Sequence, residues 1–114
     1  MQIIVNTDHH LTGSEELTAR VEADVSATLD RFSDRVTRVE VHLNDENSVK
    51  AGANDKRCMM EARVRGHPPV AVTAHADSVD IAIAAASDKL ERALDAVTGR
   101  LDDRHPAAAA GPVE

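Results

Sequence analysis

The chain has 114 residues, enough for one domain with a single hydrophobic core. Apolar residues make up 42 % of it, but much of this is alanine, and Phe32 is the only aromatic side chain. The core is therefore thin, and a partner or a second copy in a homodimer would help to stabilise it. The formal charge of −7 argues against general polyanion binding, and a single cysteine, Cys58, excludes an internal disulfide and a thiolate zinc site.

The charge is unevenly distributed along the chain. Residues 1–35 and 76–114 each carry −4, whereas residues 36–75 carry +1, with 6 basic and 5 acidic side chains. Only this middle third offers a mildly positive surface. No apolar run approaches the roughly eighteen residues of a membrane helix, and Met1 leads directly into a strand pattern. We therefore expect a cytoplasmic protein with no membrane segment.

The first third of the chain predicts a strand followed by a helix. Residues 2–6 form a short β-branched run typical of a strand. Thr12 and Glu15 have the capping-box spacing, with Ser14 as a competing cap. A helix is then expected to extend to about Phe32, with a buried face at fourfold spacing formed by Leu17, Val21, Val25, Leu29 and Phe32.

Three further strands are predicted in the middle of the chain. Residues 36–43 alternate, with Val39, Val41 and Leu43 facing the core. Residues 44–56 are a polar loop, and residues 57–65 alternate again with Cys58, Met60, Ala62 and Val64 inward. Residues 66–69 (G-H-P-P) indicate a turn, and residues 70–75 a fourth strand with Val70, Val72 and Ala74 inward.

A long C-terminal helix is predicted over residues 77–104. Asp77 or Ser78 can cap its start. Its buried stripe is expected at Ile83, Ala86, Leu90, Ala93, Leu94, Val97 and Leu101. The element order β-α-β-β-β-α then predicts an α+β two-layer sandwich, in which two helices cover one face of a four-stranded sheet and leave the other open. Residues 1–104 form this domain, and the Ala/Pro-rich residues 105–114 are expected to be a disordered tail.

Two stretches resemble the ribosome hibernation promoting factor and ribosome-associated inhibitor family, also called the S30EA or sigma-54 modulation family. Residues 28–43 (T-L-D-R-F-S-D-R-V-T-R-V-E-V-H-L) resemble its junction from helix one to strand two. Residues 80–94 (D-I-A-I-A-A-A-S-D-K-L-E-R-A-L) resemble its second-helix signature, and the similarity spans about residues 1–104. The resemblance implies a fold like that of the double-stranded RNA-binding domain.

The resemblance also implies a non-enzymatic function. Family members bind in the decoding channel of the small ribosomal subunit, where basic side chains contact 16S rRNA phosphates, and they silence translation under stress. By position, Lys89 and Arg92 fill two basic sites of the second helix, and Arg31 fills one near the end of the first. The alternative for Lys89 and Arg92 is an exposed pair balanced by neighbouring carboxylates.

The sequence departs from the family pattern in its charges. Val25 and Thr28 occupy positions that usually carry Lys or Arg, and Asp80 replaces the usual tyrosine. The basic run after the signature is reduced, and we expect a short form without a dimerisation domain. With no Tyr or Trp, base stacking is excluded, so RNA binding would be weak and salt-sensitive and would use only the backbone.

The expected open sheet face carries four arginines. On the predicted strands, Arg63 and Arg65 share a face, and Arg38 and Arg57 join them as candidates. They either bind phosphates or pair with Glu40 and Glu61 to keep the sheet soluble. The chain has no nucleophile–base constellation and no metal or cofactor motif, so an enzyme is not expected. The alternative function is that of a divergent member with an acidic surface, which has lost RNA binding and binds a protein instead.

Overall fold

The computed structural model describes residues 1–7, 14–45 and 56–103. Its elements are β1 (Gln2–Thr7), α1 (Ser14–Leu29), the 3-10 turn η1 (Asp30–Phe32), β2 (Val36–Asp45), β3 (Lys56–Val64), β4 (His67–Ala76) and α2 (Val79–Asp103). This order confirms the predicted β-α-β-β-β-α arrangement. The predicted tail (105–114), most of the predicted loop (44–56) and the Thr12 cap lie outside the described residues.

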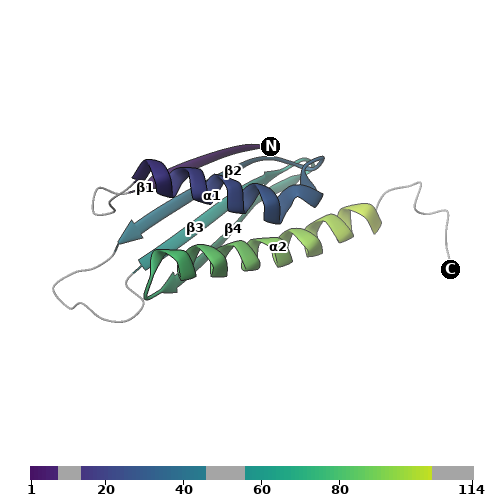
Figure 1. Cartoon of the computed structure of the whole chain (residues 1–114). Helices are drawn as coiled ribbons and strands as arrows, with labels where there is room; N and C mark the ends of the chain where they lie inside the picture. Colours follow the sequence, from purple (N-terminus) through teal and green to yellow (C-terminus); the bar gives the residue numbers. More distant parts are fainter. Residues whose placement is uncertain (8–13, 46–55, 104–114) are drawn as a thin grey trace.

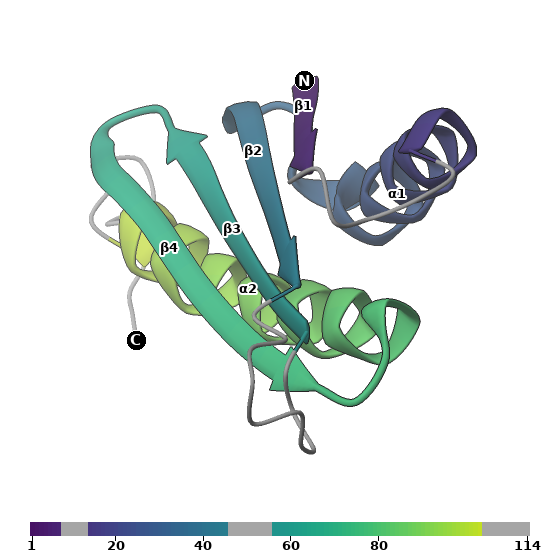
Figure 2. The same cartoon turned by 90° about the vertical axis from the view of Figure 1, so that its left-hand side faces the viewer.

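The four strands form one mixed sheet in the order β1-β2-β3-β4. β2, β3 and β4 make the predicted antiparallel meander, and β1 pairs in parallel with β2. Parallel pairing requires a crossover, and α1 provides it. Both helices lie on the same face of the sheet, with α1 near β1 and α2 across β3 and β4 (Figures 1 and 2). The two-layer α+β sandwich is therefore confirmed.

The last two strands differ in their bounds from the sequence prediction. β3 ends at Val64, so that Arg65 lies with Gly66 in a two-residue turn, and β4 already begins at His67. Gly66 has a φ of +76°, a value that a residue with a Cβ adopts only with strain, so glycine allows the turn to be this short. The following Pro68 and Pro69 are compatible with strand structure because β4 is an edge strand, where an N–H group can be absent.

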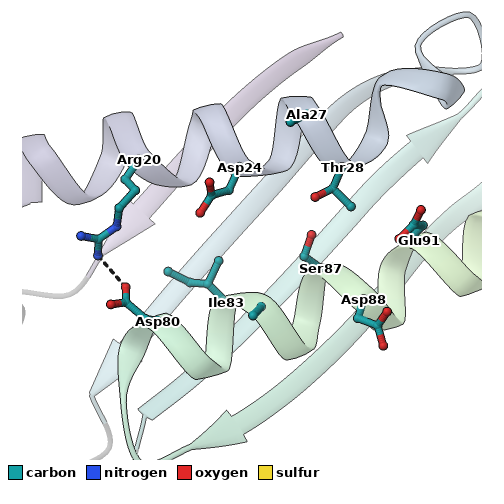
Figure 3. A pocket seen from close by; sticks show the side chains of 10 residues that line it. Arg20, Asp24, Ala27, Thr28, Asp80, Ile83, Ser87, Asp88 and Glu91 are labelled. Carbon is teal, nitrogen blue, oxygen red and sulfur yellow. Dashed lines mark hydrogen bonds and ion pairs between the residues drawn. The ribbon is translucent and has the colours of Figure 1, made fainter.

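The two helices have the buried faces that their spacing predicts, except that Ala93 is only half-buried; the side chain of Leu101 lies outside the described residues. Leu17, Val21, Val25 and Leu29 of α1 are buried, as are Ile83, Ala86, Leu90, Leu94 and Val97 of α2. Ser78 caps α2, because its Oγ accepts the backbone N–H of Ile81 at 3.2 Å. The helices lie side by side, and Arg20 of α1 reaches Asp80 of α2 at 2.6 Å across the groove between them (Figure 3).

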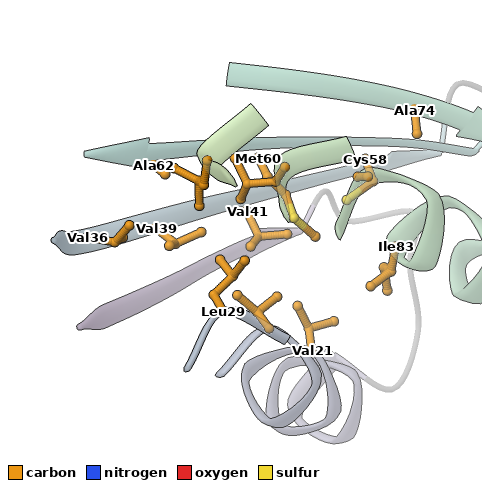
Figure 4. Packing of buried hydrophobic residues seen from close by; sticks show 14 of the residues in the cluster. Val21, Leu29, Val36, Val39, Val41, Cys58, Met60, Ala62, Ala74 and Ile83 are labelled. Atoms are coloured by element: carbon orange, nitrogen blue, oxygen red, sulfur yellow. The ribbon is translucent and has the colours of Figure 1, made fainter. Parts of the chain in front are cut away.

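The core lies between the helices and the sheet. Alternate residues of β2 and β3 point into it, as predicted, and meet α1 side chains such as Val21 and Leu29 (Figure 4). The largest fully buried side chains are Leu29, Leu43, Met60, Leu90 and Leu94. Many of the remaining core positions are alanine or valine, so a few large side chains supply much of the apolar area.

Truncation of Leu90 is expected to be costly. Leu90→Ala removes a fully buried side chain from a core that contains few large ones, and we expect a loss of about 2–5 kcal/mol in the free energy of unfolding. Ile81→Ala is the matched control on the same helix, because Ile81 is 59 % exposed, and it should change stability by no more than about 0.5 kcal/mol. Urea unfolding measures both values, and equal losses would contradict the assigned helix face.

The Cys58 thiol is expected to make stability fall at alkaline pH. Burial raises the pKa of this thiol from 9.0 to about 12, against a smaller lowering by Arg57. Between these values the unfolded chain loses the thiol proton while the folded chain keeps it, so the free energy of unfolding decreases as pH rises. The chain has no tyrosine, so besides Cys58 the lysines are the main side chains that lose a proton in this pH range. The Cys58→Ala variant keeps the lysines, so its difference from the wild type reports the thiol alone. The free energy of unfolding of this variant should fall less from pH 9 upwards.

Thiol reactivity provides a second measurement of the same burial. In the native protein at pH 8, Cys58 should react with a disulfide reagent far more slowly than in the urea-unfolded chain. A native reaction rate equal to the unfolded rate would show that this part of the core is open.

Candidate nucleic-acid interface

Four arginines come together at one end of the sheet, where β2 begins and β3 ends. Arg38 of β2 and Arg63 of β3 are directly opposite in the strand register. The backbone N–H of Arg65, in the turn after β3, donates to the carbonyl oxygen of Arg35 at 3.0 Å. We call Arg35, Arg38, Arg63 and Arg65 the arginine cluster.

Sequence reasoning predicted three of these residues and missed Arg35. Arg35 precedes the alternating pattern of the second strand, so no periodicity assigned it to the sheet face. The contact that reveals it is a backbone hydrogen bond to a residue 30 positions later, Arg65. The predicted strand geometry for Arg65 is wrong, because this residue lies in the turn and not on the strand with Arg63.

The ion pairs of the open face differ within the cluster. Arg38 forms an ion pair with Glu40, and His42 Nε2 lies 3.4 Å from the other oxygen of that carboxylate. Arg63 and Arg65 have no ion pair within the described residues. Of the two predicted carboxylate partners, Glu40 is thus paired with Arg38, whereas Glu61 forms no ion pair with a cluster arginine within the described residues. Two guanidinium groups of the cluster thus keep their donors available to a ligand.

Arg57 lies apart from the cluster. It is six residues before Arg63 on β3, which corresponds to roughly 20 Å at the rise of an extended strand. Its Nη1 donates to Asn44 Oδ1 at 3.3 Å across the pair of strands. The four arginines proposed from the sequence therefore do not form a single patch. Three of them lie together, and Arg57 is near the opposite end of the sheet.

The two α2 candidates interact with protein groups. Lys89 Nζ donates to the carbonyl oxygen of Thr73 on β4 at 2.8 Å, so it lies along the free edge of the sheet. Arg92 is paired with Asp88 at 2.8 Å, one helical turn earlier, and its side chain is 78 % exposed. The alternative of balancing carboxylates therefore describes Arg92 but not Lys89. Both cations remain at the surface, although Arg92 would exchange an existing partner for a phosphate.

Arg31 joins the end of the first helical segment to α2. Its guanidinium lies 3.1 Å from Asp95 and 3.6 Å from Glu91, and 4.2 Å above the ring of Phe32. The hydrogen bond to Asp95 and the nearby negative charges raise the pKa of Arg31. This candidate is thus engaged in holding two elements together, on the helical side of the molecule.

The described residues show little sign of other chemistry. Among them, no three His, Cys, Asp or Glu side chains are grouped so that they could hold a metal ion. No helix in the described ranges has the length and apolar character required of a membrane span. What the arrangement can do is bind anions: guanidinium groups donate paired hydrogen bonds that match phosphate oxygens.

Comparison with known proteins gives one family and a consistent fold. The model of the family described as sigma 54 modulation protein / S30EA ribosomal protein matches residues 4–102. No curated protein matches significantly. The crystal structure of the Protein Y N-terminal domain from Thermus thermophilus superposes with a TM-score of 0.64 and 26 % identity, covering 81 % of this chain and 93 % of that one.

A second solved structure, a ribosomal subunit interface protein from Coxiella burnetii, has a TM-score of 0.64 over 87 % of this chain and 99 % of that one. At 16 % identity it supports the fold alone. The family model, in contrast, spans nearly the whole described domain, including the arginine cluster and α2. The chain therefore belongs to the sigma-54 modulation protein and S30EA ribosomal protein family, a family of ribosome-associated, non-enzymatic factors.

Proposed function

We propose that this protein is a translation inhibitor of the hibernation type, which occupies the decoding channel of the small ribosomal subunit in the cytoplasm. It acts by steric occupation and carries out no catalysis. Family membership supports the ribosomal partner. The single observation that supports RNA contact is the arginine cluster, in which Arg63 and Arg65 have no ion pair within the described residues.

The chemistry of the cluster favours contact with the phosphate backbone of 16S rRNA. Arginine forks bind phosphate oxygens in pairs, and Arg63 and Arg65 have no ion pair among the described residues, whereas Arg38 would have to leave Glu40. The chain has no Tyr or Trp to stack on bases. Binding therefore depends on the shape and charge of the RNA and not on its sequence, which suits a protein that blocks a channel.

Cations on the other elements are proposed as secondary contacts. An RNA-lined channel surrounds its occupant, so contacts from more than one face are compatible with a single binding mode. Lys89 lies at the free edge of β4, Arg92 is exposed on α2, and Arg57 is near the far end of the sheet. Arg31 would contribute only by leaving Asp95 and Glu91, so we assign it the smallest share.

Association with 30S subunits should depend steeply on salt. With about four phosphate contacts, the logarithm of the affinity should fall with a slope of about −3 against the logarithm of salt concentration. Between about 50 and 200 mM salt, affinity would then fall about 60-fold. Co-sedimentation with purified 30S subunits measures this slope. An absence of pelleting at the lower salt concentration would contradict the proposal.

A matched pair of arginine substitutions tests whether the cluster makes the contact. Arg63→Gln removes one cation from the cluster and should lower the absolute salt slope by about 1. Arg20→Gln removes the same charge from the helical side, where Arg20 pairs with Asp80, and should leave the slope unchanged. Equal effects of both variants would mean that only net charge matters, which would overturn the assignment of this interface.

The acidic helices favour a second candidate function, that of a family member which has lost RNA binding and binds a protein. The supporting observation is that Arg31, Arg38 and Arg92 are each paired with a carboxylate of the chain itself. This function would be supported by a failure to pellet with 30S subunits at low salt, together with recovery of one specific protein in pull-down experiments.

A further inference from the structure

The groove between α1 and α2 has a charge opposite to that of the arginine cluster. It has a volume of about 490 Å³, within the range of ligand-binding sites, and it opens along the helices (Figure 3). One arginine, Arg20, lines it together with four carboxylates, those of Asp24, Asp80, Asp88 and Glu91. The residues that line the groove therefore carry an excess of negative charge.

Ion pairs engage three of the four carboxylates that line the groove. Arg20 pairs with Asp80 at one end, Arg31 lies near Glu91 towards the other, and Arg92 pairs with Asp88. Of the four lining carboxylates, only Asp24 has no hydrogen bond or ion pair within the described part of the chain. Its carboxylate is therefore available to a cation that enters from outside.

The floor of the groove holds a hydroxyl group without a partner. Ser87 is only 7 % exposed, and its Oγ makes no hydrogen bond. Figure 3 shows this oxygen directed from α2 towards Thr28 of α1, inside the groove. A buried hydroxyl without a partner costs free energy, so a ligand that donates a hydrogen bond here would recover it.

Small apolar side chains complete the lining of the groove. Ala27 of α1 and Ile83 and Ala84 of α2 lie beside the carboxylates. Long basic side chains combine an aliphatic stem with a charged head, and such a lining accommodates both parts. The groove runs from Asp80 to Glu91, about 16 Å along a helix axis, which matches about five residues of extended chain.

We propose that this groove binds an extended polypeptide segment rich in arginine and lysine, contributed by a partner protein. One basic side chain lies over Ile83 and Ala84, with its head group at Asp24 and the Ser87 hydroxyl. This site lies on the helices and the arginine cluster on the sheet, so the inference goes beyond the proposed RNA contact and does not depend on it.

Fluorescence anisotropy with a fluorescein-labelled hexa-arginine peptide, in the absence of ribosomes, tests this site on the intact chain. Asp24→Asn should weaken binding about tenfold, because it removes the charge at the middle of the groove. Glu22→Gln is the matched control: it makes the same charge change on an exposed residue of α1 outside this groove, and its affinity should equal that of the wild type.

Two further variants separate binding from folding. Ser87→Ala removes a hydroxyl that has no hydrogen-bond partner, so thermal stability should be unchanged or higher. The affinity for the peptide should fall about threefold. Ala84→Phe places a large side chain in the groove from an exposed helix position, and it should lower the affinity for the peptide at least tenfold. Amide shifts in a titration followed by NMR should concentrate at residues 24–28 and 83–88.

Three results would overturn the proposal. The first is equal weakening by Asp24→Asn and Glu22→Gln, which would show diffuse attraction to an acidic surface. The second is displacement of the peptide by spermidine at matched charge concentration, which would show that any polycation suffices. The third is unchanged peptide affinity in Ala84→Phe. Each result would leave the 30S pelleting experiment unaffected, so the two proposals fail independently.

Discussion

Both helices bury their apolar stripes against one face of a four-stranded sheet, and this one-sided burial determines where the charged side chains lie. Val39 and Val41 of β2 and Cys58 and Met60 of β3 face the helices. The residues between them must point to the opposite face, because side chains alternate along a strand. Polar and charged groups of adjacent strands are thereby brought together on an open surface, and the strand register decides which of them meet.

The register produces charge segregation along the open face. Arg38 meets Arg63 near one end of the sheet, whereas Glu40 meets Glu61 nearer its middle. At physiological ionic strength the field of an exposed charge is screened over about 8 Å, comparable with the roughly 10 Å between packed layers. The acidic helices therefore act only weakly on the arginine cluster, and a net charge of −7 does not prevent local binding of phosphate.

The elements of the fold were predictable because their periodicity is local. The spacing of Leu17, Val21 and Val25 identifies a helix face, and alternation identifies β2 and β3. The site was less predictable, because it depends on register and turn length. Gly66 allows a turn so short that Arg65 leaves the strand, and Arg35 joins the cluster through a backbone hydrogen bond to a distant residue.

The ion pairs of the helices could not be predicted from the sequence at all. Arg31 and Asp95 are 64 positions apart, and Arg20 and Asp80 are 60 apart, so only the packing of η1 and α1 against α2 brings each pair together. No local pattern indicates which carboxylate a given arginine will contact. The same packing forms the groove, which is why the sequence showed acidic helix faces but no binding site between them.

Three arginines of the helical side are held by carboxylates of the same chain. Asp80 holds Arg20, Asp95 holds Arg31 and Asp88 holds Arg92. Each of these pairs neutralises one cation and one carboxylate of the helical side. Within the described residues the arginine cluster is therefore left as the main concentration of positive charge.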